Sequence, residues 1–136
     1  MARTFKLEIL TSERVLLRDR EVEFVLLPAR DGYYGVLAGH APMVGLLKPG
    51  VLQYREPGQD KKAVAVLGGF FEVEPERTLV MADEAEFPEE IDVAAALAER
   101  ERTRAILEGG GNQEEVMRAR RAYEKAMARL RTVGQA

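Results

Sequence analysis

The chain has 136 residues and a net charge of −3 at pH 7, and hydrophobic and charged residues make up 46% and 32% of it. This composition excludes a disordered or fibrous protein, and the lack of cysteine excludes disulfides, thiolate metal sites and a cysteine nucleophile. No apolar run approaches the roughly 20 residues that span a bilayer, and the first residues lack the apolar block of a signal peptide. We therefore expect a cytosolic or peripheral protein.

The first ninety residues predict an antiparallel β domain. Short stretches alternate apolar and polar residues, so each strand should have one face in the core and one in water. Strands are expected near residues 5–9, 15–18, 21–26, 34–37, 51–55, 63–67, 71–73 and 78–82. The strongest turn signal lies between the strands at 51–55 and 63–67, where Pro57 presets φ and Gly58 accepts a positive φ. This spacing is typical of a sandwich or barrel.

A helical region follows Pro88, where helix formers replace the alternating pattern. Asp92 is the expected N-cap of a first helix over residues 93–108. Three glycines at 109–111 end that helix, because glycine is costly in a helix interior. So short a break predicts an antiparallel second helix, and residues 89–136 should form a two-helix hairpin.

The second helix begins with a pattern that resembles a capping box, Asn112 with Glu115 three positions later. Its apolar residues recur at steps of three and four and form one seam: Val116, Ala119, Tyr123, Ala126, Leu130 and Val133. The first helix has a weaker seam. Two helices alone bury little area, so the hairpin should be marginally stable unless it docks on another surface.

The two parts of the chain differ in charge. Residues 1–90 carry eleven basic and sixteen acidic side chains, whereas residues 91–136 carry nine and seven. The segment from Gln113 to Arg131 alone has six basic and three acidic residues. A solvated helix face is the simpler interpretation, and an acidic protein partner is the alternative. Nucleic acid is disfavoured, because aromatic side chains that would stack on bases are missing.

The sequence shows no catalytic constellation. His40 is the only histidine, so a packed or loop residue is a better interpretation of it than a metal ligand. The neighbouring glycines belong to neither a P-loop nor a dinucleotide fingerprint. Acidic pairs such as Asp83-Glu84 and Glu89-Glu90 are interpreted as solvated turns, not as general acid/base pairs. We therefore expect a protein without enzymatic activity and without a metal site.

Two motifs resemble one known family. The stretch from Gly35 to Gly50, GVLAGHAPMVGLLKPG, resembles the G-[IV]-L-P-G-H-x-P…L…P-G signature of ATP synthase epsilon subunits. GGFFEV at 68–73 resembles that family's G-G-F-x-E-V strand pair, and Ile91-Asp92 lies where the family begins its C-terminal hairpin with [IL]-D. The chain is therefore identified as a member of the epsilon subunit family of F-type ATP synthases.

The resemblance implies a ten-stranded β-sandwich over residues 1–88 and a regulatory helical hairpin over residues 89–136. It implies a non-catalytic rotor subunit of the central stalk that binds the gamma subunit and the c ring and couples proton-driven rotation to ATP synthesis. The hairpin would either fold down on the sandwich or extend along gamma, contact the catalytic beta and alpha subunits transiently and inhibit ATP hydrolysis. The implied location is peripheral, at the cytoplasmic face of the bacterial plasma membrane, with no lipid insertion.

The resemblance also assigns partner-binding residues. The positions that match the family's gamma-facing surface are Thr11, His40 and Gly45. The residues expected at the c ring are Asp31, Tyr33 and Tyr34. Tyr33 stands where many bacterial members have Glu, and Ala38 replaces the usual Pro of the first motif.

No cofactor is expected, apart from weakly bound regulatory ATP. The positions that match the family's nucleotide site are Ile91, Asp92, Arg102 and Arg129. Ala95 occupies the Arg position of the [IL]-D-x-x-R-A motif by which some bacterial members bind ATP. The loss of this guanidinium predicts weak ATP binding.

The inhibitory role implied for the hairpin rests on four cations of the second helix, which would face acidic loops of the catalytic head: Arg118, Arg121, Lys125 and Arg129. The folded-down state is expected to be held mainly by apolar packing, through Val116, Tyr123, Met127 and Leu130. On this view salt should weaken the extended form selectively.

Two other functions are weighed beside the rotor subunit. The first is a free-standing β-sandwich binding module with a dimerising helical hairpin, which would purify alone or as a homodimer instead of with gamma. The second is a small hydrolase, which would need a convergent polar pocket that the sequence does not show.

Overall fold

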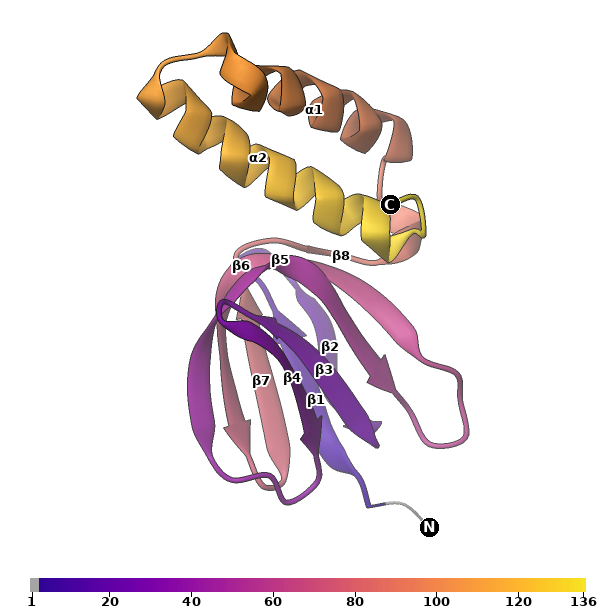
Figure 1. Ribbon diagram of the computed structural model, residues 1–136. Coiled ribbons are helices and arrows are strands. Elements are labelled where there is room, and N and C mark those ends of the chain that lie inside the picture. Colours follow the sequence, from indigo (N-terminus) through magenta and orange to yellow (C-terminus); the bar gives the residue numbers. More distant parts are fainter. Residues whose placement is uncertain (1–2) are drawn as a thin grey trace.

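The computed structural model describes residues 3–136 and shows a β-sandwich beneath a two-helix hairpin (Figure 1). The strands are β1 (Phe5–Leu10), β2 (Val15–Val22), β3 (Phe24–Ala29), β4 (Gly32–Leu37), β5 (Met43–Arg55), β6 (Lys62–Glu74), β7 (Arg77–Ala82) and β8 (Ala85–Glu86). The helical elements are η1 (Pro88–Glu90), α1 (Val93–Ala105), η2 (Ile106–Gly110) and α2 (Gln113–Thr132). The predicted fold class is confirmed. No helix within these described residues is both long and apolar enough to cross a membrane.

The strands form one continuous path, β2-β1-β7-β6-β5-β3-β4, with β8 paired to β6. β5 and β6 have 13 residues each, and both pass across the end of the sandwich beneath α2 (Figure 1). Each of these two long strands takes the place of two shorter ones, so the structure has eight strands where about ten were expected. Strands that bend from one sheet into the other are a usual way to close a sandwich.

One pairing departs from the predicted antiparallel arrangement. β1 lies parallel to β7, with Lys6 opposite Arg77 and Leu10 opposite Met81, whereas every other pair in the described chain is antiparallel. A parallel pair needs a long crossover connection and leaves no short-range turn signal in the sequence. The alternation of β1 is the same in either orientation, so the sequence pattern did not reveal it.

β6 is buried on both of its faces. Val64 and Val66 belong to the sandwich core together with the inward residues of the other strands. Ala65 and Leu67 point the other way and belong to a second apolar cluster with Ala128 of α2. An uninterrupted apolar run, as at 63–67, is typical of a strand that is covered on both sides. The sandwich core and the docking surface for the hairpin therefore share this strand.

The hairpin forms through the predicted caps. Asp92 Oδ1 accepts a hydrogen bond from the Ala95 backbone N–H at 3.0 Å, and Asn112 and Glu115 form a capping box. α1 is shorter than the predicted helix, because the backbone widens into the π-helical turn η2 and reaches a φ of 120° at Gly109. Only glycine takes up that conformation cheaply, so the glycine run reverses the chain between the helices.

We expect Gly69→Ala to destabilise the sandwich. The φ of Gly69 is +119°, and a Cβ there would lie 2.1 Å from the Met81 carbonyl oxygen on the neighbouring strand. Backbone strain alone should lower the free energy of unfolding by about 1–3 kcal/mol, and the clash adds to it. Urea denaturation measures this change. Gly35→Ala is the control, because a Cβ at Gly35 meets no atom within 4 Å; equal losses for both variants would contradict the explanation.

Candidate functional site

The contact between hairpin and sandwich is the candidate functional site. α2 lies between the sandwich and α1 (Figure 1) and packs on β5 and β6. The apolar part of the contact is small: Ala65 and Leu67 of β6 meet Ala128 of α2 and Ile91 of the linking segment, with Val93 and Val133 at the edge. The hairpin is thus in its folded-down state, which the sequence alone left open.

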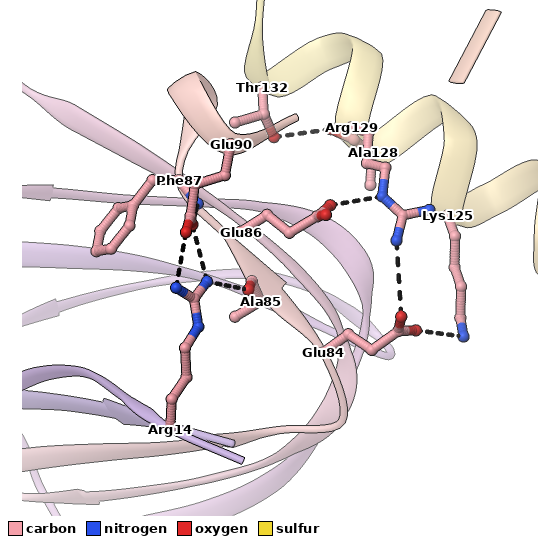
Figure 2. A network of polar contacts seen from close by, with 10 residues as sticks. All are labelled: Arg14, Glu84, Ala85, Glu86, Phe87, Glu90, Lys125, Ala128, Arg129 and Thr132. Atoms are coloured by element: carbon pink, nitrogen blue, oxygen red, sulfur yellow. Dashed lines mark hydrogen bonds and ion pairs between the residues drawn. The ribbon is translucent and has the colours of Figure 1, made fainter. Parts of the chain in front are cut away.

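Ion pairs join α2 to the segment around β8 (Figure 2). Lys125 Nζ lies 2.8 Å from a carboxylate oxygen of Glu84, and Arg129 Nε lies 2.6 Å from Glu86. Arg129 also reaches Glu84 at 3.6 Å. The hydrogen bond from Lys125 and the charges of Lys125 and Arg129 lower the pKa of Glu84 although its burial opposes this. The carboxylate is therefore held in its charged form against both cations.

These pairs correct two expectations. Glu84 is paired with cations of α2 and is not simply a solvated turn residue. Ion pairs also join the apolar packing that was expected to be the main support of the folded-down state. Leu130 is fully buried, whereas Val116, Tyr123 and Met127 are only partly buried. Lys125 and Arg129, two of the four expected inhibitory cations, are bound to the sandwich in this state. Salt also screens these partly exposed pairs, so we expect it to weaken the folded-down form as well as the extended form.

A second polar cluster fastens the link between sandwich and hairpin (Figure 2). Arg14 donates to both carboxylate oxygens of Glu90, at 2.7 and 2.8 Å, and to the Ala85 carbonyl at 3.0 Å. The Phe87 backbone N–H donates to Glu90 at 2.8 Å. The bond from Arg14, followed by that from Phe87, lowers the pKa of Glu90 to about 2. Glu90 therefore anchors η1 to the β1–β2 turn, where the sequence suggested only a solvated acid.

The four nucleotide-site positions are already engaged within the chain. Ile91 is buried in the apolar cluster, and Asp92 caps α1. Arg102 Nε donates to Glu99 at 3.0 Å, and Arg129 is paired with Glu86. Arg102 and, more weakly, Arg129 both lower the pKa of Glu99. A phosphate group would have to displace carboxylates from both guanidinium groups.

The three expected gamma-facing residues do not form one cluster. Thr11 Oγ1 accepts from the Arg14 backbone N–H at 3.1 Å in the β1–β2 turn, beside the hairpin. His40 lies at the opposite end of β1 and β7, where the adjacent Gly39 N–H donates to the Pro75 carbonyl in the β6–β7 turn. Gly45 lies between them and faces inward, since a Cβ there would lie 2.5 Å from the Phe71 ring.

The two tyrosines expected at the c ring lie on opposite faces of β4. Tyr34 packs against the sandwich core, and its hydroxyl donates to Asp31 at 2.9 Å. Tyr33 is half exposed; its hydroxyl accepts from the Val51 N–H at 3.3 Å, and the Lys48 ammonium lies 5.6 Å from its ring centroid. Asp31 and Tyr33 are therefore the exposed members of the set.

An exposed apolar patch on the outer face of β5 and β6 was not predicted. Val44, Leu46 and Phe70 are 74%, 52% and 45% exposed, and Leu46 lies directly opposite Phe70. Contiguous apolar side chains on a soluble protein commonly mark a protein interface. The signal in the sequence is the run MVGLL at 43–47, which places apolar side chains on both faces of a strand.

Both parts of the chain match one family. The β-sandwich domain of the ATP synthase delta/epsilon chain matches residues 4–88, and the long alpha-helix domain of the same chain matches residues 89–134. The chain belongs to the ATP synthase delta/epsilon chain family. Similar proteins named "ATP synthase epsilon chain" occur in Symbiobacterium thermophilum, at 44% identity over 94% of this chain and 91% of the relative, and in Desulforamulus reducens, at 42% over 96% and 98%.

Solved structures agree with this family assignment. A chain of the Euglena gracilis mitochondrial ATP synthase OSCP/F1/c-ring structure matches with a TM-score of 0.83 and 25% identity, over 92% of this chain and 78% of that chain. A chain of the Tetrahymena thermophila central stalk/c-ring structure shares the fold, with a TM-score of 0.66 and 12% identity, over 97% and 98%.

The Arg14–Glu90 pair predicts an acid-sensitive contribution to stability. Because the folded state lowers the pKa of Glu90 to about 2, the contribution is present above the ordinary glutamate pKa and is lost as pH falls toward 2. Both side chains are more than a third exposed, so solvent screening limits the pair to about 1 kcal/mol or less. Glu90→Gln should therefore lower the free energy of unfolding near neutral pH, and its difference from wild type should shrink in acid.

Urea denaturation across this pH range measures the effect. Glu89→Gln is the matched control, because it removes the same charge from the neighbouring exposed position, which pairs with no cation among residues 3–136. If the two variants lose the same stability at every pH, the pair contributes nothing specific.

Proposed function

We propose that this chain is the epsilon subunit of an F-type ATP synthase and a non-catalytic part of its central stalk. The observation that carries the proposal is the match of the delta/epsilon chain family to both parts, over residues 4–88 and 89–134 in the same order. Relatives at above 40% identity bear the name ATP synthase epsilon chain. In this role the chain couples proton-driven rotation to ATP synthesis from the cytoplasmic face of the bacterial plasma membrane.

The gamma subunit is the proposed partner of the outer face of β5 and β6. Val44 and Leu46 flank Gly45, the expected gamma-facing position, and they expose the apolar surface that Gly45 itself does not. Buried apolar side chains at the centre of an interface usually supply most of its binding energy. Thr11 and His40 would lie near opposite margins of this contact.

The c ring is the proposed partner of the β3–β4 turn. Tyr33 offers a half-exposed ring with an amphipathic edge, and Asp31 offers an exposed carboxylate. Tyr34 supports this turn from within by its hydrogen bond to Asp31. The contact therefore combines an aromatic surface with a single acid.

Inhibition of ATP hydrolysis is the proposed role of α2. Arg118, Arg121, Lys125 and Arg129 recur at steps of three and four and so follow one side of the helix. In an extended hairpin this cationic stripe would face acidic loops of the catalytic beta and alpha subunits. In the folded-down state the sandwich holds two of its members, which supports the proposal that this state is the non-inhibitory one.

We expect Leu46→Glu with Phe70→Glu to weaken the binding of the chain to purified gamma. Two opposed side chains at the centre of the patch should contribute at least about 2 kcal/mol to binding, or roughly thirtyfold in affinity. Surface plasmon resonance measures the change. Met117→Glu is the control, because Met117 is equally exposed but lies on α2. Gly45 is unsuitable as a probe, since any side chain there disturbs Phe71.

Two outcomes would count against this assignment. If the double variant binds gamma with unchanged affinity, the apolar patch is not part of the interface. If the wild-type chain does not bind gamma and forms a homodimer, the interpretation as a free-standing binding module is favoured instead.

Hydrolysis assays test the inhibitory stripe. Truncation after Glu108 and the double variant Arg118→Ala with Arg121→Ala should both raise ATP hydrolysis by the reconstituted enzyme without loss of assembly. Each exposed ion pair is worth about 0.2–1 kcal/mol, so the double variant should act a few-fold. Arg120→Ala with Arg131→Ala is the matched control, because these exposed residues lie on another side of the same helix. If the truncated chain inhibits as well as the full chain, the proposal for α2 is wrong.

A further inference from the structure

The cationic stripe of α2 is divided into two halves in the folded-down state. At its C-terminal half, Lys125 and Arg129 are paired with Glu84 and Glu86 across the domain boundary. At its N-terminal half, Arg118 pairs only with Glu114 of the same helix, at 3.4 Å. The exposed Arg121 pairs with no carboxylate within residues 3–136. Half of the stripe is thus occupied and half is available.

Backbone pairing with β6 fixes the position of the two acids. Glu86 belongs to β8 and lies opposite Ala65 of β6, and the Leu67 N–H donates to the Glu84 carbonyl at 2.9 Å. Glu84 lies in the bend before β8, and its carboxylate points toward α2 together with that of Glu86 (Figure 2). Residues four apart lie on the same side of a helix, so Lys125 and Arg129 both reach these acids.

We infer that Glu84 and Glu86 form an electrostatic latch on Lys125 and Arg129, so that closure of the hairpin in this chain is set by ionic strength and by competing carboxylates and not by nucleotide. Glu84 and Glu86 thus occupy the cations that an acidic partner protein would otherwise bind. The effect of the latch on ATP hydrolysis rests on the proposed function of α2. The existence of the latch does not depend on that proposal.

Competition follows from the shared cations. Lys125 and Arg129 cannot bind the sandwich and an acidic segment of another subunit at the same time. Such a segment can first meet Arg118 and Arg121, which the sandwich leaves free, and then displace Glu84 and Glu86 from the other half. The order of events is therefore contact at the N-terminal half of the stripe, exchange of carboxylates and release of α2.

Nucleotide is a poor competitor for the same cations. Ala95 supplies no guanidinium, Arg102 is held by Glu99, and Arg129 is held by Glu86. The charge of Arg129 also lowers the pKa of Glu99. A polyphosphate would meet carboxylates at each of these positions, whereas salt screens all of the pairs together.

The link between the domains is fastened separately from the latch. Arg14 binds Glu90 from the β1–β2 turn and forms no hydrogen bond or ion pair with α2 in the part of the chain that the structure describes. Opening of the latch therefore leaves η1 on the sandwich, and movement of the hairpin begins after Glu90.

Single-molecule energy transfer in the full chain tests the latch without any partner. Because the chain lacks cysteine, Asp60→Cys and Met117→Cys can carry two dyes at exposed positions of the sandwich and of α2. Raising the salt from about 0.01 M to about 1 M shortens the Debye length from roughly 30 Å to 3 Å. The ratio of closed to open molecules should fall about tenfold, as expected for three exposed pairs. ATP at constant ionic strength should leave it unchanged.

Two charge variants separate the latch from general charge effects. Glu84→Gln with Glu86→Gln should lower the closed-to-open ratio about tenfold at low salt and remove most of its salt dependence. Glu74→Gln with Glu76→Gln is the matched control: it removes the same charge at exposed positions of the sandwich, and neither side chain pairs with a cation among residues 3–136. The control should behave like wild type.

Charge reversal provides the rescue. Glu84→Lys with Glu86→Lys should open the hairpin, and the further changes Lys125→Glu and Arg129→Glu should close it again. The latch is overturned if the glutamine pair closes as often as wild type, if the four-fold reversal stays open, or if ATP closes the wild-type hairpin. A latch that passes these tests while Glu84→Gln with Glu86→Gln leaves hydrolysis by the reconstituted enzyme unchanged would instead refute the inhibitory role of α2.

Discussion

The double burial of β6 is the constraint on which the arrangement of the two domains depends. Val64 and Val66 fill the sandwich, and Ala65 and Leu67 require a cover on the other side. α2 supplies that cover mainly through Ala128, a side chain too small to contribute much area. Apolar burial therefore decides where the hairpin docks, but it leaves the strength of docking to other contacts.

Polar contacts supply the remainder and do so at two separate places. Glu90 accepts hydrogen bonds from the two terminal guanidinium nitrogens of Arg14 and from a backbone N–H, which ties the linking segment to the sandwich. Glu84 and Glu86 instead reach across to α2, where each pair is partly exposed and individually weak. The first cluster fixes the linking segment to the sandwich, and the second joins α2 itself to the sandwich.

Much of the fold could be predicted from the sequence because it follows from local patterns. The alternation in residues 5–9 gives β1, and Asn112 with Glu115 gives the start of α2. The parallel partner of β1 could not be predicted in this way, since pairing over long distances leaves no trace in local periodicity. The lengths of β5 and β6 were likewise hidden, because Pro49 and the glycines at 68–69 resemble breaks between strands.

The site was predicted less well than the fold, for a physical reason. Lys125 and Arg129 could be recognised as a basic helix face, but their partners Glu84 and Glu86 lie about forty residues earlier in an ordinary acidic turn. Nothing in that turn distinguishes a solvated acid from a paired one. The motif match at Gly45 likewise gave no sign that a Cβ at this position would point toward the Phe71 ring.

The parallel contact between β1 and β7 also bears on how the chain folds as it is made. Lys6 and Arg77 are paired although they lie 71 positions apart, so β1 lacks one neighbour until nearly the whole sandwich has left the ribosome. Contacts of such long range carry a large loop-closure entropy and slow the folding of β domains to milliseconds or longer. Until then β1 can pair only with β2. The last strands that complete the sandwich are synthesised just before the hairpin that covers it.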